Sequence, residues 1–278
     1  MIDQPSVPVV MTLAGNDPTG GAGIQADIES IISMGCHPAP VITAITVQDT
    51  ARVMGFAPLD AELIIHQARA VLEDMPVAAI KIGLLGSIEA VQAVHTLLSD
   101  YPDLPVVLDP VLASGSGTAL ADEEIIDGIL TLLAPFTTLM TPNSLEARNL
   151  ATGSDTLDAC AMSLLDQGTE YVLITGTHEK TGRVHNTLYG NHRRLDTFTV
   201  DRLEGHFHGS GCTLSSAIAA LLAQGTVPSA AVHEGLNYTW NTLRHAHRLG
   251  MGQMIPNRLF WAGENIEDDP NDQTRHAD

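Results

Sequence analysis

The chain has 278 residues, of which 33 are acidic and 13 are lysine or arginine, so its formal net charge is −20. This charge argues against nucleic acid or an anionic membrane as a partner, because both are polyanions that attract basic surfaces. No apolar run approaches membrane-spanning length, and the first residues lack the positive charge of a secretion signal. Three widely separated cysteines argue against a disulfide framework or a zinc site and favour the cytoplasm (Cys36, Cys160 and Cys212).

Apolar runs rich in valine, isoleucine and leucine alternate with amphipathic segments along most of the chain. The runs predict buried parallel strands at 9–13, 41–47, 77–85, 106–112, 137–140 and 171–174. Helical periodicity between them predicts helices at 24–34, 61–72, 88–98, 123–132 and 157–165. Two short strands of a hairpin follow at 187–189 and 197–200, and then two further helices at 212–223 and 230–248.

This alternation predicts an α/β fold of three layers, with helices on both faces of a central, mostly parallel sheet. The length fits one large domain, which we place at 1–263. The acidic, polar stretch 264–278 has little apolar content, so we expect a disordered tail there. Ligands of open α/β sheets bind beyond the carboxyl ends of the strands. Polar or glycine-rich clusters follow several predicted strands, at 14–17, 48–49, 83, 109–110, 142–143 and 175–176.

The stretch 208–220, His-Gly-Ser-Gly-Cys-Thr-Leu-Ser-Ser-Ala-Ile-Ala-Ala, joins a turn of small residues to an apolar helix. The unsatisfied amides and the positive dipole end of such a helix suit a phosphate or a developing oxyanion. A thiol on the first turn is expected to ionise more readily than a free cysteine. We therefore expect phosphoryl transfer at Gly209, Ser210, Gly211 and Cys212, with Cys212 as the base. The alternative for Cys212 alone is a small side chain that faces the core.

Carboxylates end or follow two of the predicted strands. Asp109 could hold Mg²⁺ directly or through water, or it could be a turn aspartate before proline. Asn143 and Glu146 fit a capping box at the start of a helix. They also fit a metal and phosphate site, and the two interpretations can coexist.

Several polar residues leave structural and functional alternatives open. Lys81 lies in an apolar run, where it either faces inward with a buried partner or extends its ammonium towards a strand end. The loop 14–27 either closes over a small substrate or is an ordinary glycine-rich turn, and it lacks the dinucleotide-binding spacing. Most histidines are interpreted as solvated surface residues, with His208 beside the glycine turn as the exception.

Six sequence blocks carry a resemblance to a known family, at 14–27, 41–50, 81–85, 108–111, 141–146 and 209–213. Together they resemble the ribokinase-like superfamily, in particular the hydroxymethylpyrimidine/phosphomethylpyrimidine kinases of thiamine biosynthesis. The resemblance covers roughly residues 9–248. Sugar kinases of the superfamily usually carry aspartate at the position of Cys212, so the cysteine favours the pyrimidine and vitamin-B6 branch.

The resemblance implies an enzyme that uses ATP and Mg²⁺ to phosphorylate 4-amino-5-hydroxymethyl-2-methylpyrimidine. Gln48 would hydrogen-bond the ring, and Cys212 would face the hydroxymethyl oxygen. Asp109 and Glu146 would hold the metal, while Asn143, Glu146 and Thr175 would bind the nucleotide phosphates. The resemblance also implies a homodimer. The remaining residues of the pyrimidine pocket would be Gly15, Ala22, Asp27, Leu84 and Val111.

The chain departs from the family pattern at two places. Residues 114–117 read Ser-Gly-Ser-Gly where relatives commonly carry Ala-Lys-Ser-Gly, and 175–178 read Thr-Gly-Thr-His where relatives commonly carry Lys-Gly-Gly-His. Loss of both lysines is expected to weaken phosphate binding unless Arg183, His178 or extra Mg²⁺ compensates. Phosphorylation of the pyrimidine monophosphate, which already carries a phosphate, is therefore the less secure half of the expected activity. Two alternative functions are pyridoxal or pyridoxine phosphorylation and pyrimidine binding by a non-catalytic regulatory protein.

Overall fold

Nine strands lie side by side in one sheet in the computed structural model, which describes residues 7–115 and 117–262. The order across the sheet is β3-β2-β1-β4-β5-β6-β7-β8-β9. The strands are β1 (Val9–Asn16), β2 (His37–Gln48), β3 (Val53–Pro58), β4 (Val77–Ile82), β5 (Val106–Leu108), β6 (Leu139–Met140), β7 (Tyr171–Ile174), β8 (Arg183–Gly190) and β9 (Arg193–Asp201). From β2 to β7 all neighbours are parallel, and the edge strands β3, β8 and β9 pair antiparallel.

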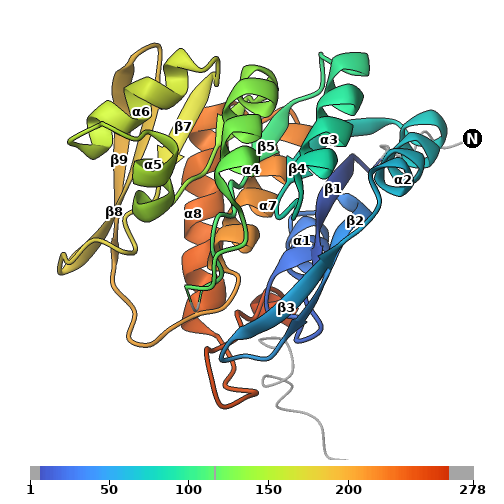
Figure 1. Cartoon of the computed structure of the whole chain (residues 1–278). Helices are drawn as coiled ribbons and strands as arrows, with labels where there is room; N and C mark the ends of the chain where they lie inside the picture. Colours follow the sequence, from blue (N-terminus) through green and yellow to red (C-terminus); the bar gives the residue numbers. More distant parts are fainter. Residues whose placement is uncertain (1–6, 116, 263–278) are drawn as a thin grey trace, which may run out of the picture.

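Helices cover both faces of this sheet, as Figure 1 shows. They are α1 (Gly23–Ser33), α2 (Ala61–Asp74), α3 (Ile88–Asp100), α4 (Glu123–Gly128), α5 (Ser144–Leu150), α6 (Leu157–Asp166), α7 (Ser210–Ala223) and α8 (Pro228–Arg244). Because successive side chains of a strand point to opposite faces, Val10 and Met11 of β1 belong to two different cores. One core lies under α2 to α6, and the other lies under α1, α7 and α8. The three-layer α/β fold predicted from the sequence is confirmed.

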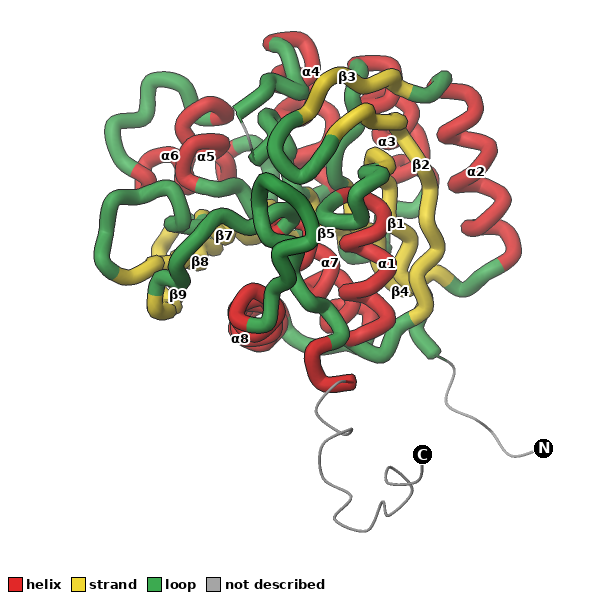
Figure 2. Tube along the Cα trace, turned by 90° about the horizontal axis from the view of Figure 1, so that it is seen from below, coloured by secondary structure: helices red, strands yellow, loops and turns green. Residues whose placement is uncertain are grey.

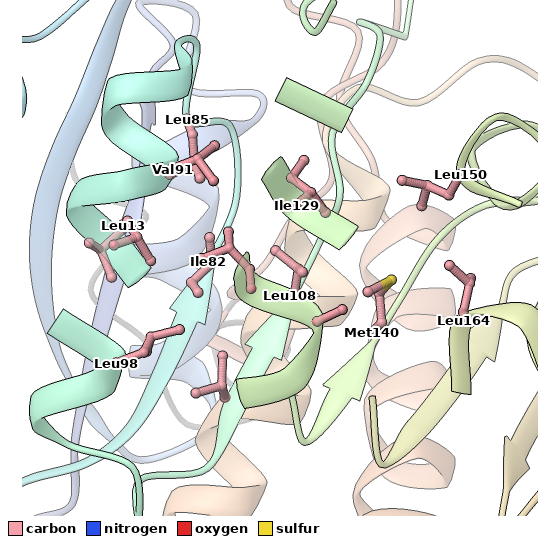
Figure 3. Packing of buried hydrophobic residues seen from close by; sticks show 14 of the residues in the cluster. Leu13, Ile82, Leu85, Val91, Leu98, Leu108, Ile129, Met140, Leu150 and Leu164 are labelled. Atoms are coloured by element: carbon pink, nitrogen blue, oxygen red, sulfur yellow. The ribbon is translucent and has the colours of Figure 1, made fainter. Parts of the chain in front are cut away.

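The larger core fills the space between the sheet and α2 to α6. Figure 3 shows Leu13, Ile82, Leu108 and Met140 from neighbouring strands in a row, with the helix residue Leu164 beside Met140. All five of these side chains are almost completely removed from solvent. Continuous burial on both faces explains why the central strands read as unbroken apolar runs rather than as alternating patterns.

Five of the described helices begin at a side-chain cap, whereas α1, α7 and α8 do not. Asp60, Ser87, Asp122, Asn143 and Thr156 accept hydrogen bonds from the first amides of α2, α3, α4, α5 and α6. By contrast, α1 and α7 begin without a side-chain cap of their own. The first amides of α7 therefore have no side-chain cap as a partner.

Several predicted boundaries were wrong. The antiparallel strand β3 was not predicted, because Gly55 and Pro58 interrupt a short and partly exposed segment. The last predicted helix ends at Arg244 rather than at residue 248, and β5 ends at Leu108, before Pro110. The tail expected at 264–278 lies outside the described residues. Within residues 7–115 and 117–262, no helix has both the length and the apolar character needed to cross a membrane.

Candidate active site

The carboxyl ends of the parallel strands bring the predicted clusters to one edge of the sheet. Leu84, which follows β4, packs closely against Gly15 at the end of β1, so that a Cβ atom at Gly15 would lie only 3.0 Å from the Leu84 side chain. Asn143 and Thr175, which follow β6 and β7, form a parallel bridge. Figure 2 looks at this end of the molecule, where loops gather between β1, β5 and α7. The arrangement matches the position at which open α/β sheets bind their ligands.

The glycine turn before α7 depends on a backbone conformation that glycine adopts freely. Gly209 has a φ of +73°, and a Cβ atom there would overlap the carbonyl oxygen of Gly21. The turn is therefore packed closely against the loop that leads into α1. With no side-chain cap at Gly209, the amides of Ser210, Gly211 and Cys212 are candidates for a phosphate cradle.

Cys212 lies half-buried on the first turn of α7, beside the carboxyl of Asp109. Burial raises the pKa of its thiol to about 12; Lys81 opposes this shift, and the charges of Asp109 and Asp27 add to it. The expectation that the helix start would promote ionisation of Cys212 is wrong for the ligand-free protein. Loss of water and two nearby carboxylates outweigh the helix dipole and the lysine.

Asp109 and Glu146 form a pair of buried carboxyl groups beside the glycine turn. They are 4% and 8% exposed. Burial, together with the Asp109 charge, raises the pKa of Glu146 to about 8, although hydrogen bonds from the Asn143 and Leu112 amides oppose the shift. Burial also raises the pKa of Asp109, against the attraction of Lys81. Two carboxyl groups that resist ionisation together are suited to a divalent cation.

The carboxyl pair fits Mg²⁺ with only part of its coordination supplied by the protein. Among the described residues, no group of three or more histidine, cysteine or acidic side chains converges on a common point. Mg²⁺ usually keeps several waters and is held by one or two carboxylates plus substrate phosphates. Asp109 and Glu146 match this donor set.

Replacing Glu146 with glutamine tests the carboxyl pair, and the sign of the pH effect follows from its pKa. The pKa is about 8 in the folded protein, above the ordinary value of 4.5. The stability that depends on a protonated Glu146 is therefore present at low pH and is lost as the pH rises from the ordinary value of 4.5 through about 8. In Mg²⁺-free buffer at pH 9, we expect the free energy of unfolding of Glu146→Gln to be about 1–3 kcal/mol higher than that of the wild type.

Denaturant unfolding at pH 6 and pH 9, with and without Mg²⁺, checks this prediction. Mg²⁺ should stabilise the wild type most at pH 9 and should have little effect on Glu146→Gln. Glu89→Gln, on the exposed first turn of α3, is the matched control. An equal response to Mg²⁺ in all three proteins would contradict the assignment.

Asn143 and Glu146 also form the capping box predicted from the sequence. The Asn143 side chain accepts hydrogen bonds from the amides of Leu145 and Glu146 at 2.9 and 3.0 Å. Oε2 of Glu146 accepts the amide of Asn143 at 2.8 Å. One carboxylate oxygen is therefore engaged in the cap, and the structural and metal-binding interpretations are compatible. Thr175 lies beside Asn143, and its amide donates a hydrogen bond to the carbonyl oxygen of Pro142.

Asp27 occupies a different place from the pocket wall expected for it. Its carboxylate is fully buried and accepts hydrogen bonds from Lys81 Nζ at 2.9 and 3.0 Å. Thr12 and Ser216 donate two further hydrogen bonds to it, at 2.6 and 2.7 Å. Asp27 therefore joins α1, α7, β1 and β4 beneath the site rather than facing a ligand. The structure also settles the alternatives for Lys81, which faces inward with a buried partner.

Two contacts that sequence reasoning missed hold the glycine turn against the loop before α1. His208 Nε2 lies 2.8 Å from Asp17 Oδ2. Burial opposes ionisation of Asp17, but hydrogen bonds from His208 and Thr19 hold the pKa of Asp17 below its ordinary value. Arg258, almost fully buried, donates to the carbonyl oxygens of residues 20 and 21 and to Thr213 Oγ1. The position of His208 beside the glycine turn in the sequence could have indicated its contact with Asp17. Arg258 lies alone in an irregular segment, and no sequence pattern there indicates its contacts.

A cavity of about 350 Å³ contains the expected ring-binding residue Gln48. The amide Nε2 of Gln48 donates to Thr46 Oγ1 at 2.9 Å, which orients the side chain. Of the residues expected around the pyrimidine, Gln48 alone lines this cavity. Ala22 lies at the start of α1, where its amide donates to Asp17, and Val111 follows Asp109. The cavity is lined by Pro18, Thr19, Gln48, Asp49, Thr50, Ala51, Gly250 and Met251.

The cations expected to compensate for the missing lysines are not free for this task. Arg183 forms an ion pair with Asp201 at the edge of the sheet, at 3.1 Å. Partial burial lowers the pKa of His178; Glu179 opposes this shift, and Arg202 adds to it. His178 therefore favours its neutral form, which provides little attraction for a phosphate.

The mostly parallel sheet, its two helical layers and the uncapped glycine turn define a ribokinase-like α/β kinase. The chain belongs to the phosphomethylpyrimidine kinase family, whose model matches residues 17–257. It is 37% identical over 263 residues to the hydroxymethylpyrimidine/phosphomethylpyrimidine kinase of Mycobacterium leprae, covering 90% of this chain and 94% of that one. The enzyme of the same description from Streptomyces coelicolor is 37% identical over 251 residues, covering 88% and 92%.

Solved structures agree with this placement. The phosphomethylpyrimidine kinase of Clostridium difficile is 33% identical, with a TM-score of 0.72 over 84% of this chain and 98% of that one. An ADP complex of Bacillus subtilis pyridoxal kinase superposes with a TM-score of 0.83 at 25% identity, over 92% and 100% of the two chains. The fold is thus shared by kinases of two related ring compounds.

Proposed function

We propose that this protein transfers the γ-phosphate of ATP to the hydroxymethyl group of 4-amino-5-hydroxymethyl-2-methylpyrimidine, a step of thiamine biosynthesis. The pyrimidine monophosphate is the second acceptor that we propose. One observation carries the assignment of a phosphoryl-transfer site: the uncapped start of α7 lies beside the buried carboxyl group of Asp109, whose charge acts on the buried carboxyl group of Glu146. The names of the relatives support the choice of substrate.

Some residues of the site stabilise charge during phosphoryl transfer, and others orient the two substrates. The amides of residues 210–212 stabilise negative charge on the transferring group. Asp109 and Glu146 hold Mg²⁺, which neutralises phosphate charge when bound. Asn143 and Thr175 orient the nucleotide phosphates beside this pair, and Gln48 binds the ring. As the hydroxymethyl oxygen forms its bond to the γ-phosphorus, the bond from that phosphorus to the β-phosphate oxygen breaks and ADP leaves.

Cys212 is the proposed acceptor of the hydroxymethyl proton. In the ligand-free protein the thiol is neutral because its pKa is about 12. Only a thiolate can take the proton, so the rate of a single turnover should rise with pH over the range in which the thiol begins to ionise.

A coupled assay that measures ADP release tests the proposed function. Free pyrimidine, its monophosphate and pyridoxine are each supplied as the acceptor, with ATP and Mg²⁺. We expect the highest kcat/KM for the free pyrimidine, and product identity is checked by mass spectrometry. The pyrimidine assignment fails if pyridoxine is the better substrate or if no acceptor is phosphorylated.

A second candidate function is phosphorylation of pyridoxal or pyridoxine, because the superposition on Bacillus subtilis pyridoxal kinase extends over 92% of this chain. The same assay separates the two functions through competition between the acceptors. A regulatory protein without catalysis is the third alternative; it predicts ring binding without ATP binding in calorimetry. The homodimer and the cytoplasmic location remain predictions, which gel filtration and cell fractionation can measure.

A further inference from the structure

A cavity of about 440 Å³, separate from the one at Gln48, lies just before the glycine turn. Its walls come from four parts of the chain: the loop after β2, the loop after β5, the segment between β9 and α7, and the loop that follows α8. Figure 2 shows the loops that meet at this end of the molecule. The cavity is lined by Ala51, Gly115, Gly205, His206, Arg248, Gly252 and Gln253.

Backbone hydrogen bonds fix the walls of this cavity. The amide of Gly252 donates to Thr50 Oγ1 at 3.0 Å, and the amide of Gln253 donates to the Thr50 carbonyl at 2.8 Å. The amide of Met254 donates to the carbonyl of His206 at 2.8 Å. The loop after α8 is thus tied both to the loop after β2 and to the segment that enters the glycine turn.

The charged side chains that line the cavity are basic, although the chain as a whole carries a net charge of −20. Arg248 and His206 line it, and no aspartate or glutamate does. Within the described residues Arg248 has no carboxylate partner, and its only hydrogen bond is a 3.5 Å contact with the carbonyl of Gly252. Five other arginines are paired with carboxylates, namely Arg69, Arg148, Arg183, Arg194 and Arg258. Within the described residues Arg52, Arg193, Arg202 and Arg244 form no such ion pair, but none of these four lines the cavity.

The position of the cavity connects it to the proposed phosphoryl-transfer site. Gly205 and His206 stand immediately before the turn at Gly209, and Gly115 belongs to the loop that leaves Asp109. Ala51 lines both this cavity and the one that contains Gln48. A ligand that reaches from the glycine turn or from Gln48 towards solvent would therefore meet a guanidinium and an imidazole.

We propose that this cavity is an anion-binding subsite in which Arg248 and His206 bind a phosphate group of a ligand held at the active site. The proposal rests on the proposed function. A guanidinium binds phosphate through two parallel hydrogen bonds, and an unpaired arginine loses no existing ion pair when it does so. The phosphate belongs either to the phosphorylated pyrimidine or to the nucleotide; both present the same chemistry to the subsite.

Arg248→Gln, compared with Arg244→Gln, tests the subsite. Both arginines lie at the end of α8 or just beyond it, but Arg244 packs over the ring of Trp240 and does not line the cavity. Calorimetry with inorganic pyrophosphate measures the affinity of the subsite directly. We expect Arg248→Gln to weaken this binding about 10- to 100-fold, while Arg244→Gln stays close to wild type.

Steady-state kinetics of the same variants identify the source of the phosphate. A higher KM for ATP alone would assign the subsite to the nucleotide, and a higher KM for the monophosphate alone would assign it to the acceptor. The KM for the free pyrimidine should not change. Equal pyrophosphate affinity in wild type and Arg248→Gln, or an equal loss in both variants, would overturn the proposal. Calorimetry needs no turnover, so this outcome is distinct from a failure of the proposed kinase activity.

Discussion

Replacing Cys212 with alanine is expected to lower kcat about 10²- to 10⁴-fold, the usual loss when a positioned proton acceptor is removed. The sulfur lies beside Asp109 on the first turn of α7, within the phosphoryl-transfer site proposed above. Ring affinity should change little, because the cavity at Gln48 does not include Cys212. Single-turnover rates and calorimetry with the free pyrimidine measure the two effects separately.

Cys160→Ala is the matched control, because Cys160 lies on α6, is fully buried in the larger core and is far in sequence from the glycine turn. It should retain a kcat close to that of wild type. The wild-type rate should also keep rising above pH 9, towards the thiol pKa of about 12, because the neutral thiol must lose its proton to accept another. If the alanine variant turns over at the wild-type rate, Cys212 is not the proton acceptor.

Replacing Lys81 with methionine is expected to lower the free energy of unfolding by about 3–5 kcal/mol. The substitution leaves the fully buried carboxylate of Asp27 without its cation. Although burial alone would lower the pKa of Lys81, the adjacent Asp27 carboxylate raises it above its ordinary value, so the lysine is charged in the folded protein. Denaturant unfolding at neutral pH measures the loss.

The double variant Lys81→Met with Asp27→Leu separates the cost of an unpaired charge from the value of the pair. Because apolar replacements of a complete buried pair are often neutral, it should recover much of the lost stability. Arg194→Ala, which breaks an exposed ion pair with Asp158, should cost about 0–1 kcal/mol. A decrease of less than about 1 kcal/mol in the free energy of unfolding of Lys81→Met would contradict a charged, buried ion pair between Lys81 and Asp27.

The sequence predicted the layers of the fold because the central strands are buried on both faces. An unbroken apolar run such as 106–108 is typical of a strand in the middle of a parallel sheet, and these residues form the buried strand β5. Boundaries were harder to predict where tertiary contacts decide them. The helix predicted at 123–132 begins as expected at Glu123 but changes at Ile129 to a wider turn, which periodicity does not reveal.

The candidate site was predicted to the extent that its chemistry is local. The glycine turn and the capping box of Asn143 and Glu146 are short motifs with a fixed spacing, and the structure contains both. The burial of Asp27 and its pairing with Lys81 depend on residues 54 positions apart. The raised pKa of Cys212 depends on how much water the folded chain removes, which a helix start alone does not determine.

A crystal structure with Mg²⁺, a non-hydrolysable ATP analogue and the free pyrimidine tests the central claim most directly. The account predicts the terminal phosphate at the amides of residues 210–212 and the metal between Asp109 and Glu146. It also predicts the hydroxymethyl oxygen in contact with the Cys212 sulfur. Phosphates bound elsewhere, with these amides and carboxylates in contact with water alone, would contradict it.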